Sequence, residues 1–185
     1  MGAAVLLLVV ILVVVLVVYW ATYNSLVSLR QQTQNAFSQI DVQLKRRYDL
    51  IPNLVETAKG YMKYEGDTLE RVIQARNKAV NAQSVGDKAA AETEVKQALA
   101  NVFALSEAYP ELKANEQMQS LMEELKSTEN KIAFARQYYN DIVTSYNTKL
   151  QVFPSSIIAN MGGFKPKEMF EIEDAAQRDP VKVQF

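Results

Sequence analysis

Residues 5–18 read VLLLVVILVVVLVV, an unbroken run of branched aliphatic side chains. Tyr19, Trp20 and Tyr23 close the run, and the first charged side chain is Arg30. A bilayer has a hydrocarbon core about 30 Å thick and a helix rises about 1.5 Å per residue, so roughly 20 apolar residues span it. We therefore predict a transmembrane anchor helix over residues 1–23. Its lipid contacts are expected at Val5, Leu8, Ile11, Leu16, Tyr19 and Trp20.

Two other interpretations of this run are less favoured. A cleaved signal peptide has a basic start, a shorter apolar region and a small-residue cleavage site. No basic residue precedes Val5, and residues 20–23 are too bulky for such a site. A buried helix in the core of a soluble protein is the second alternative, but a helix apolar on every face fits lipid better. The nearest basic residues, Arg30 and the triplet 45–47, follow the span, which favours a cytoplasmic domain on that side.

The composition of this 185-residue chain excludes several classes of function. Cysteine and histidine are both absent, which removes thiol nucleophiles, Cys/His zinc sites and histidine general bases. Lysine and arginine number 20 against 21 aspartate and glutamate, whereas nucleic-acid binding needs a basic excess. We therefore expect neither an enzyme nor a nucleic-acid-binding protein, and we identify no cofactor and no small-molecule substrate. The one basic cluster, Lys45-Arg46-Arg47, is interpreted as a solvated helix face.

Apolar residues recur at helical spacing through residues 24–151, which predicts an all-α domain. The clearest helix runs from about residue 116 to 151, with Asn115 as its N-cap. Its apolar seam comprises Met118, Leu121, Leu125, Thr128, Ile132, Ala135, Tyr139, Ile142 and Tyr146. Shorter seams cover residues 26–48, 55–79 and 91–109, with turns at 84–87 and 109–112. Four such segments bury their seams most simply in an antiparallel four-helix bundle.

Pro52 and the C-terminal segment leave open questions of chain path. Proline removes a helical hydrogen bond, so the chain either turns at Pro52 or continues as one long kinked helix, and we favour the turn. Residues 152–185 mix aromatics with helix breakers and are predicted to form a short, irregular, extended tail. Its phenylalanines Phe153, Phe164 and Phe170 are expected to pack back over the bundle.

Several phrases of this sequence occur together in a known family. They include RYDLIPNLV at 47–55, AYPELKAN at 108–115, TENKIA at 128–133 and Phe153-Pro154. With these phrases in this order, the chain resembles the bacterial LemA family. The resemblance implies a membrane-anchored four-helix bundle in the bacterial inner (cytoplasmic) membrane. It brings no established activity, catalytic residue or cofactor.

Five polar residues lie beside or opposite the seam of the helix at 116–151. They are Glu129, Asn130, Arg136, Asn140 and Asn147. We interpret them as a candidate polar network that fixes register within the bundle, because buried polar groups must be paired. The alternative is a charged groove that binds a partner or ligand.

The preferred functional hypothesis is a non-enzymatic, single-pass scaffold or adaptor that self-associates or docks a partner at the membrane. Its expected partners are the lipid bilayer, further copies of the chain in a homo-oligomer, and another membrane protein. The alternative is an accessory or regulatory subunit of a membrane protein quality-control or signalling system. An enzyme would need a site made of carboxylates alone.

Overall fold

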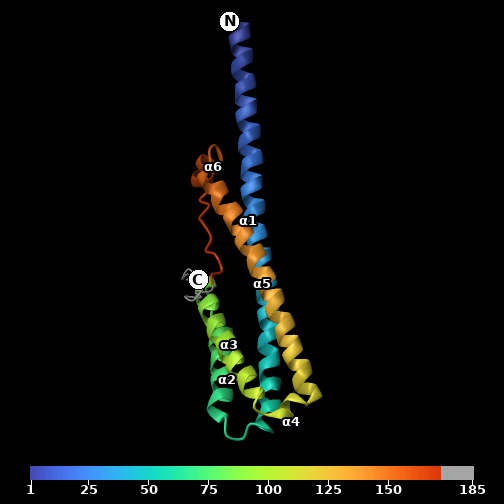
Figure 1. Ribbon diagram of the computed structural model, residues 1–185. Helices are drawn as coiled ribbons and strands as arrows, with labels where there is room; N and C mark the ends of the chain where they lie inside the picture. Colours follow the sequence, from blue (N-terminus) through green and yellow to red (C-terminus); the bar gives the residue numbers. More distant parts are fainter. Residues whose placement is uncertain (172–185) are drawn as a thin grey trace, which may run out of the picture. The chain divides into compact units, whose positions relative to one another are not determined.

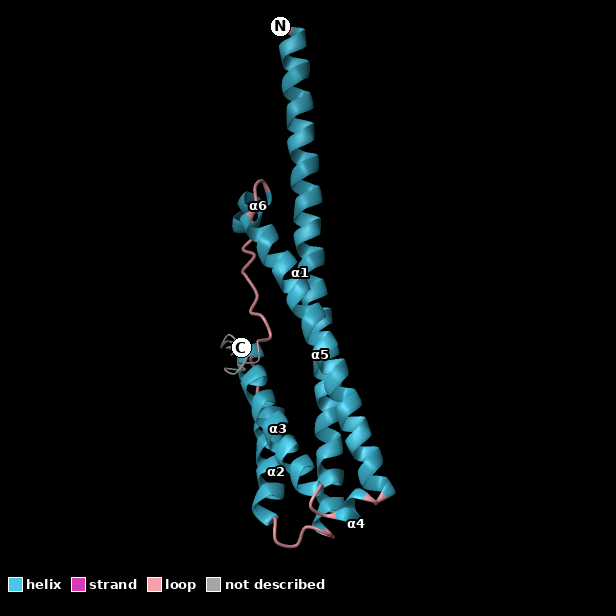
Figure 2. Ribbon diagram, viewed as in Figure 1, coloured by secondary structure: helices cyan, strands magenta, loops and turns pink. Residues whose placement is uncertain are grey.

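The computed structural model describes residues 1–171, and those residues form helices joined by short loops (Figures 1 and 2). The helices are α1 (Gly2–Lys59), α2 (Gly66–Asn81), α3 (Val85–Ser106), α4 (Pro110–Lys113), α5 (Glu116–Gln151) and α6 (Ser155–Met161). No strand occurs within residues 1–171. The prediction of an all-α protein is confirmed.

The chain divides into two compact units, each of which has its own packed side chains. The N-terminal unit consists of residues 1–38 with 137–168, and the central unit consists of residues 39–136 with residues 169–171. The helices α1 and α5 contribute to both units, whereas α2, α3 and α4 belong to the central one. The part of the predicted tail beyond residue 171 lies outside the described residues.

The turn predicted at Pro52 is wrong, because α1 continues through this proline to Lys59. Pro52 has no N–H for the carbonyl of Tyr48, four residues earlier, which would otherwise receive a helical hydrogen bond. In the structure, Nε of Arg76 on α2 donates to that carbonyl oxygen at 3.3 Å. The Pro52 side chain is exposed, so its ring faces solvent. The chain reverses instead between Gly60 and Glu65.

The helix caps follow the sequence closely at two positions. Asn115 accepts a hydrogen bond from the backbone N–H of Met118 at 2.9 Å, which confirms it as the N-cap of α5. Ser84 accepts from the N–H of Asp87 at 3.0 Å and caps α3. The turn predicted at 84–87 is therefore shorter than expected, since α3 already begins at Val85. Residues Ala82 to Ser84 connect it to α2, and α2 and α3 pack against each other.

The apolar seams of the central unit are buried. Residues from α1, α2, α3, α4 and α5 contribute to this core, among them Ile40, Leu44, Leu54, Val72, Val95, Val102, Leu112, Met118, Leu125 and Ile132. On α5 the seam departs from prediction at one step: Ile142 is only half-buried, whereas Val143 is fully buried. A helix has 3.6 residues per turn, so residues in a strict seven-residue repeat drift gradually around the helix axis. After several repeats the residue that follows the predicted one, here Val143, faces the core.

The tail differs from the prediction in its first part. Residues 155–161 form the short helix α6 instead of an extended segment. Phe164 and Phe170 are buried as expected, but Phe153 is 81% exposed and does not pack back. After α6, Gly163 adopts φ +66°, a left-handed conformation that glycine tolerates best. The N–H of Phe164 then donates to the carbonyl of Ala159 at 3.0 Å, which closes the helix end.

The hydrogen bond from Arg76 to the Tyr48 carbonyl, which Pro52 cannot reach with an N–H, can be tested by a double-mutant cycle. Arg76→Met leaves the Tyr48 carbonyl without a protein donor and should cost about 1–3 kcal/mol of unfolding free energy. In the Pro52→Ala background, residue 52 regains its N–H, so the same substitution should cost less by about 1 kcal/mol or more. Urea unfolding of the full chain, followed by circular dichroism, measures both.

Arg71→Met is the matched control, since Arg71 is an exposed arginine on the same helix. Its cost should be small and equal in both backgrounds. Identical costs of Arg76→Met with and without Pro52 would contradict this role of Arg76 in the continuous helix.

Candidate functional site

A cluster of ionisable side chains lies inside the central unit, where α1, α3 and α5 meet. Arg47 and Tyr48 come from α1, Glu92 from α3 and Glu129 from α5. The Arg47 Nη1 atom lies 2.9 Å from Glu92 Oε2 and 2.7 Å from Glu129 Oε2. The Tyr48 hydroxyl donates to the other oxygen of Glu92. One guanidinium therefore links two carboxylates from different helices.

Burial decides the electrostatics of this cluster. The side chains of Arg47 and Glu92 are 5% and 2% exposed, whereas that of Glu129 is 37% exposed. Burial raises the pKa of Glu92 above its ordinary value, and Arg47 and Tyr48 oppose that shift only in part. Burial and the neighbouring Glu92 also raise the pKa of Tyr48, which stays a neutral donor. Arg47 therefore lies between one almost fully buried carboxyl group, Glu92, and one partly exposed carboxyl group, Glu129.

A groove runs beside this cluster between α3 and α5, with a volume of about 380 Å³. Its walls are mainly apolar, and charged groups lie at its edges. The lining residues follow helical spacing on both helices: Lys96, Leu99, Ala100 and Phe103 on α3, and Met122, Glu123, Leu125, Lys126 and Glu129 on α5, with Arg47 from α1. Positions spaced by three and four residues share one helix face, so the groove presents two parallel ridges.

A second groove, of about 330 Å³, borders the same cluster on the side of Tyr48. It lies between α1, α2 and the start of α3, and its walls include Tyr48, Arg76 and Lys88. Lys88 pairs with Asp41 across it. Arg47 and Tyr48 are neighbours in sequence, about 100° apart around α1, which explains why they face different grooves.

The five residues predicted as a polar network lie in different places. Glu129 joins the Arg47 cluster, and Asn130 on the same helix is exposed. Arg136 is half-buried. In the N-terminal unit, Asn147 holds the backbone of Lys167 with two hydrogen bonds of 2.8 and 2.9 Å, and Asn140 is half-buried. Glu129 and Asn147 thus fix different segments, and a single network of all five stays a prediction.

Sequence reasoning misses three members of the buried cluster. The interpretation of Arg47 as part of a solvated face is wrong, since only its neighbours Lys45 and Arg46 are exposed. Tyr48 is identifiable from the sequence only as a seam residue. Glu92 could have been identified from the sequence, because this residue lies on the apolar stripe that includes Val95, Leu99 and Val102. A carboxylate on an apolar stripe indicates a buried partner.

The side chains predicted to contact lipid are exposed along the first part of α1. Val5, Leu8, Ile11, Leu16, Tyr19 and Trp20 all lie between 41% and 69% exposed. Within residues 1–171, α1 is the one helix long and apolar enough to cross a membrane. The same part of the chain holds no group of three carboxylates placed to bind a metal ion.

Comparisons with known proteins identify relatives for most of the chain. The LemA family model matches residues 36–185. Protein LemA of Metamycoplasma hominis is 31% identical over 146 residues, which cover 77% of this chain and 65% of that protein. Magnetosome protein MamQ 2 of Paramagnetospirillum magneticum is 27% identical over 179 residues, or 83% of this chain and 66% of that protein. The chain thus spans just under two thirds of the length of these relatives.

The raised pKa of Glu92 predicts a specific dependence of stability on pH. The folded state binds the Glu92 proton more tightly than the unfolded state does. Proton binding therefore stabilises the fold, and this stabilisation is complete below the pKa that Glu92 has in the unfolded chain. That effect is lost as pH rises through the folded pKa. Glu92→Gln stays neutral and still accepts from Tyr48, so its stability relative to wild type should increase from pH 5 upward. Between the pKa values of Glu92 in the unfolded and folded states, the unfolding free energy of Glu92→Gln relative to wild type should rise by about 1.4 kcal/mol for each pH unit.

Glu94→Gln is the matched control on the same helix, because the Glu94 side chain is 49% exposed and pairs with Lys78 at the surface. Its substitution should cost little stability, because exposed ion pairs contribute about 0–1 kcal/mol. Parallel stability curves for wild type and Glu92→Gln, measured by urea unfolding, would contradict the assignment of Glu92.

Proposed function

Because the chain belongs to the LemA family, we propose that it is a membrane-anchored, non-enzymatic scaffold built on an antiparallel four-helix bundle. The observation that carries the proposal is the apolar groove between α3 and α5, on a chain whose first helix suits a membrane span. The names of the relatives support a non-enzymatic role, since they name a family and a cellular structure instead of a reaction.

The proposed anchor is the first part of α1, residues 1–23, and its aliphatic run extends from Val5 to Val18. The side chains of this run are 41–69% exposed, which is unfavourable in water and favourable in lipid. The basic residue nearest to the span, Arg30, follows it, as do Lys45 and Arg46. This asymmetry supports an orientation in a bacterial inner membrane with the central unit in the cytoplasm. The single candidate span within residues 1–171 supports a single-pass topology.

The groove between α3 and α5 is proposed to receive a helix from a second copy of this chain. Amphipathic helices bind such grooves through side chains spaced by three and four residues. Phe134 on α5 is 73% exposed in the central unit and does not line the groove. The exposed Phe134 of one copy can therefore enter the apolar groove of another copy. Because the two features lie on different faces of the unit, this contact is head-to-tail and can repeat. Repetition of this contact would produce a scaffold.

The buried cluster has a supporting role in this proposal. Arg47 and Glu129 are among the residues that line the groove, and their ion pair also connects α1 to α5. We infer that this pair fixes the register of α5 against α1 and thereby the spacing of the two ridges. Docking of a different membrane protein in the same groove is the adaptor alternative, which would also suit an accessory subunit.

The absence of cysteine from the chain allows a direct test by disulfide trapping. Two full-length chains with different tags are co-expressed, one carrying Ala100→Cys in the groove and the other Phe134→Cys. Oxidation of isolated membranes should yield a mixed disulfide dimer, because self-association through the groove brings these positions into contact between copies.

Asn101→Cys is the matched control, since Asn101 is exposed on α3 one position beyond Ala100 and does not line the groove. Paired with Phe134→Cys, it should give several-fold less dimer. Equal yields from Ala100→Cys and Asn101→Cys, or no dimer from either, would contradict the self-association proposal.

A further inference from the structure

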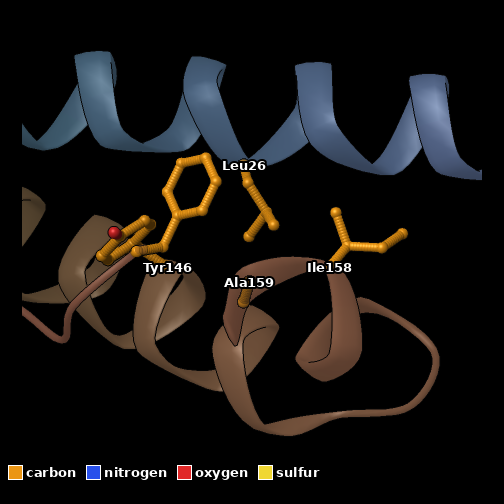
Figure 3. Packing of buried hydrophobic residues seen from close by; sticks show 5 residues of the cluster. Leu26, Tyr146, Ile158 and Ala159 are labelled. Carbon is orange, nitrogen blue, oxygen red and sulfur yellow. The ribbon is translucent and has the colours of Figure 1, made fainter. Parts of the chain in front are cut away.

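The short helix α6 and the residues just before it carry apolar side chains on two faces, and only one face is covered within the N-terminal unit. Ser155, Ile158 and Ala159 are buried on the inner face. Ile158 and Ala159 pack there with Leu26 of α1 and Tyr146 of α5 (Figure 3). The outer face is formed by Ile157 and Met161, which are spaced by four residues and are 54% and 72% exposed. Phe153, which is 81% exposed, lies in the turn just before the helix.

The position of α6 along α1 is defined by contacts at the end of the anchor. The rings of Tyr19 and Tyr23 stack at 6.3 Å, and Tyr23 meets Phe164 edge-on at 5.6 Å. Leu26, which contacts α6, follows Tyr23 by three residues, or about 4.5 Å along the helix axis. The headgroup layer on each side of the hydrocarbon core is about 5–8 Å thick. If the aromatics mark the edge of the core, α6 lies within that layer.

The turn after α6 holds the helix firmly in this position. Gly163 has the left-handed φ of +66° that returns the chain towards α1. At Gly162, an added Cβ would lie 2.6 Å from the Phe164 ring, so the close packing of that ring requires glycine. The guanidinium of Arg30 lies 5.2 Å from the centre of the same ring. Phe164 is therefore clamped between Tyr23, Arg30 and the end of α6.

The segment from Ile142 to Lys167, which includes α6, carries charges of one sign, and Asp141 and Glu168 adjoin it on either side. Between Ile142 and Lys167 the sequence contains Lys149, Lys165 and Lys167 but no aspartate or glutamate. Arg30 adds a fourth positive charge on α1 beside Phe164. Exposed apolar side chains with surrounding lysines are the pattern of segments that lie in the interface of an anionic membrane.

We propose that α6 is a second membrane contact, which lies in the headgroup layer of the bilayer that α1 spans. Phe153, Ile157 and Met161 enter the boundary of the acyl chains, and the surrounding lysines contact lipid phosphates. The proposal rests on the membrane anchor assigned under the proposed function. A lone transmembrane helix can rotate about its own axis in lipid. A second membrane contact beside that helix prevents this rotation, so α6 sets the orientation of the N-terminal unit at the membrane.

The test uses the full chain in vesicles of mixed phosphatidylcholine and phosphatidylglycerol, with one cysteine at a time labelled by an environment-sensitive fluorophore. Ile157→Cys reports on α6, Leu12→Cys on the anchor and Ser38→Cys on the aqueous side. Ser38 is exposed and follows Tyr23 by fifteen residues, about 22 Å along α1. Nitroxide lipids carry the quencher either near the headgroup or near the end of the acyl chain.

The proposal predicts that the label at Ile157 loses about half its emission to the shallow quencher and less to the deep one, because interfacial helices bury their apolar face about 5–10 Å deep. The label at Leu12 should be quenched best by the deep nitroxide, and that at Ser38 by neither. Quenching at Leu12 without quenching at Ile157 would overturn the second contact and leave the anchor intact. Absence of quenching at Leu12 would instead overturn the anchor itself. A blue-shifted but unquenched label at Ile157 would show that protein covers this face, which also contradicts the proposal.

Discussion

The apolar surface of α1 between Val5 and Val18 is the constraint on which the other features of the protein depend. Folding of residues 1–171 leaves these fourteen side chains exposed. Contact of such apolar side chains with water is unfavourable, whereas contact with lipid is favourable. On a membrane-insertion scale, residues of this type contribute about 0.3–0.6 kcal/mol each at the centre of a span, or roughly 4–8 kcal/mol together. That surface is the basis of the proposed membrane location, and the remaining features describe what the protein would present there.

The central unit shows the opposite arrangement, with charges inside. Arg47 and Glu92 are almost fully buried, and each has a partner from another helix. Removing one partner of such a group is costly, whereas the intact cluster contributes little net stability. In the proposed function, its role is to fix how α1, α3 and α5 are arranged, because Arg47 contacts a carboxylate from each of the other two helices.

The sequence is most informative where a local pattern determines structure. The bounds of α5, its cap at Asn115 and the exposed apolar segment of α1 could all be predicted, because helical periodicity, capping and hydropathy are local properties. Continuation through Pro52 could not, since the compensating donor, Arg76, lies 24 positions later and approaches only after folding. The helix α6 has seven residues, which is too short for periodicity to reveal. The burial of Arg47 escapes prediction for the same reason as Pro52, because Glu92 and Glu129 come from distant segments.

The central claim is that α1 is embedded in a membrane, and alkaline extraction tests it most directly. Membranes from cells that express the full chain are washed at high pH, which releases peripheral proteins but not helices that span the bilayer. We predict that the chain stays in the membrane pellet and is released only by detergent. Recovery of the chain in the alkaline supernatant, or in the soluble fraction before the wash, would contradict the claim.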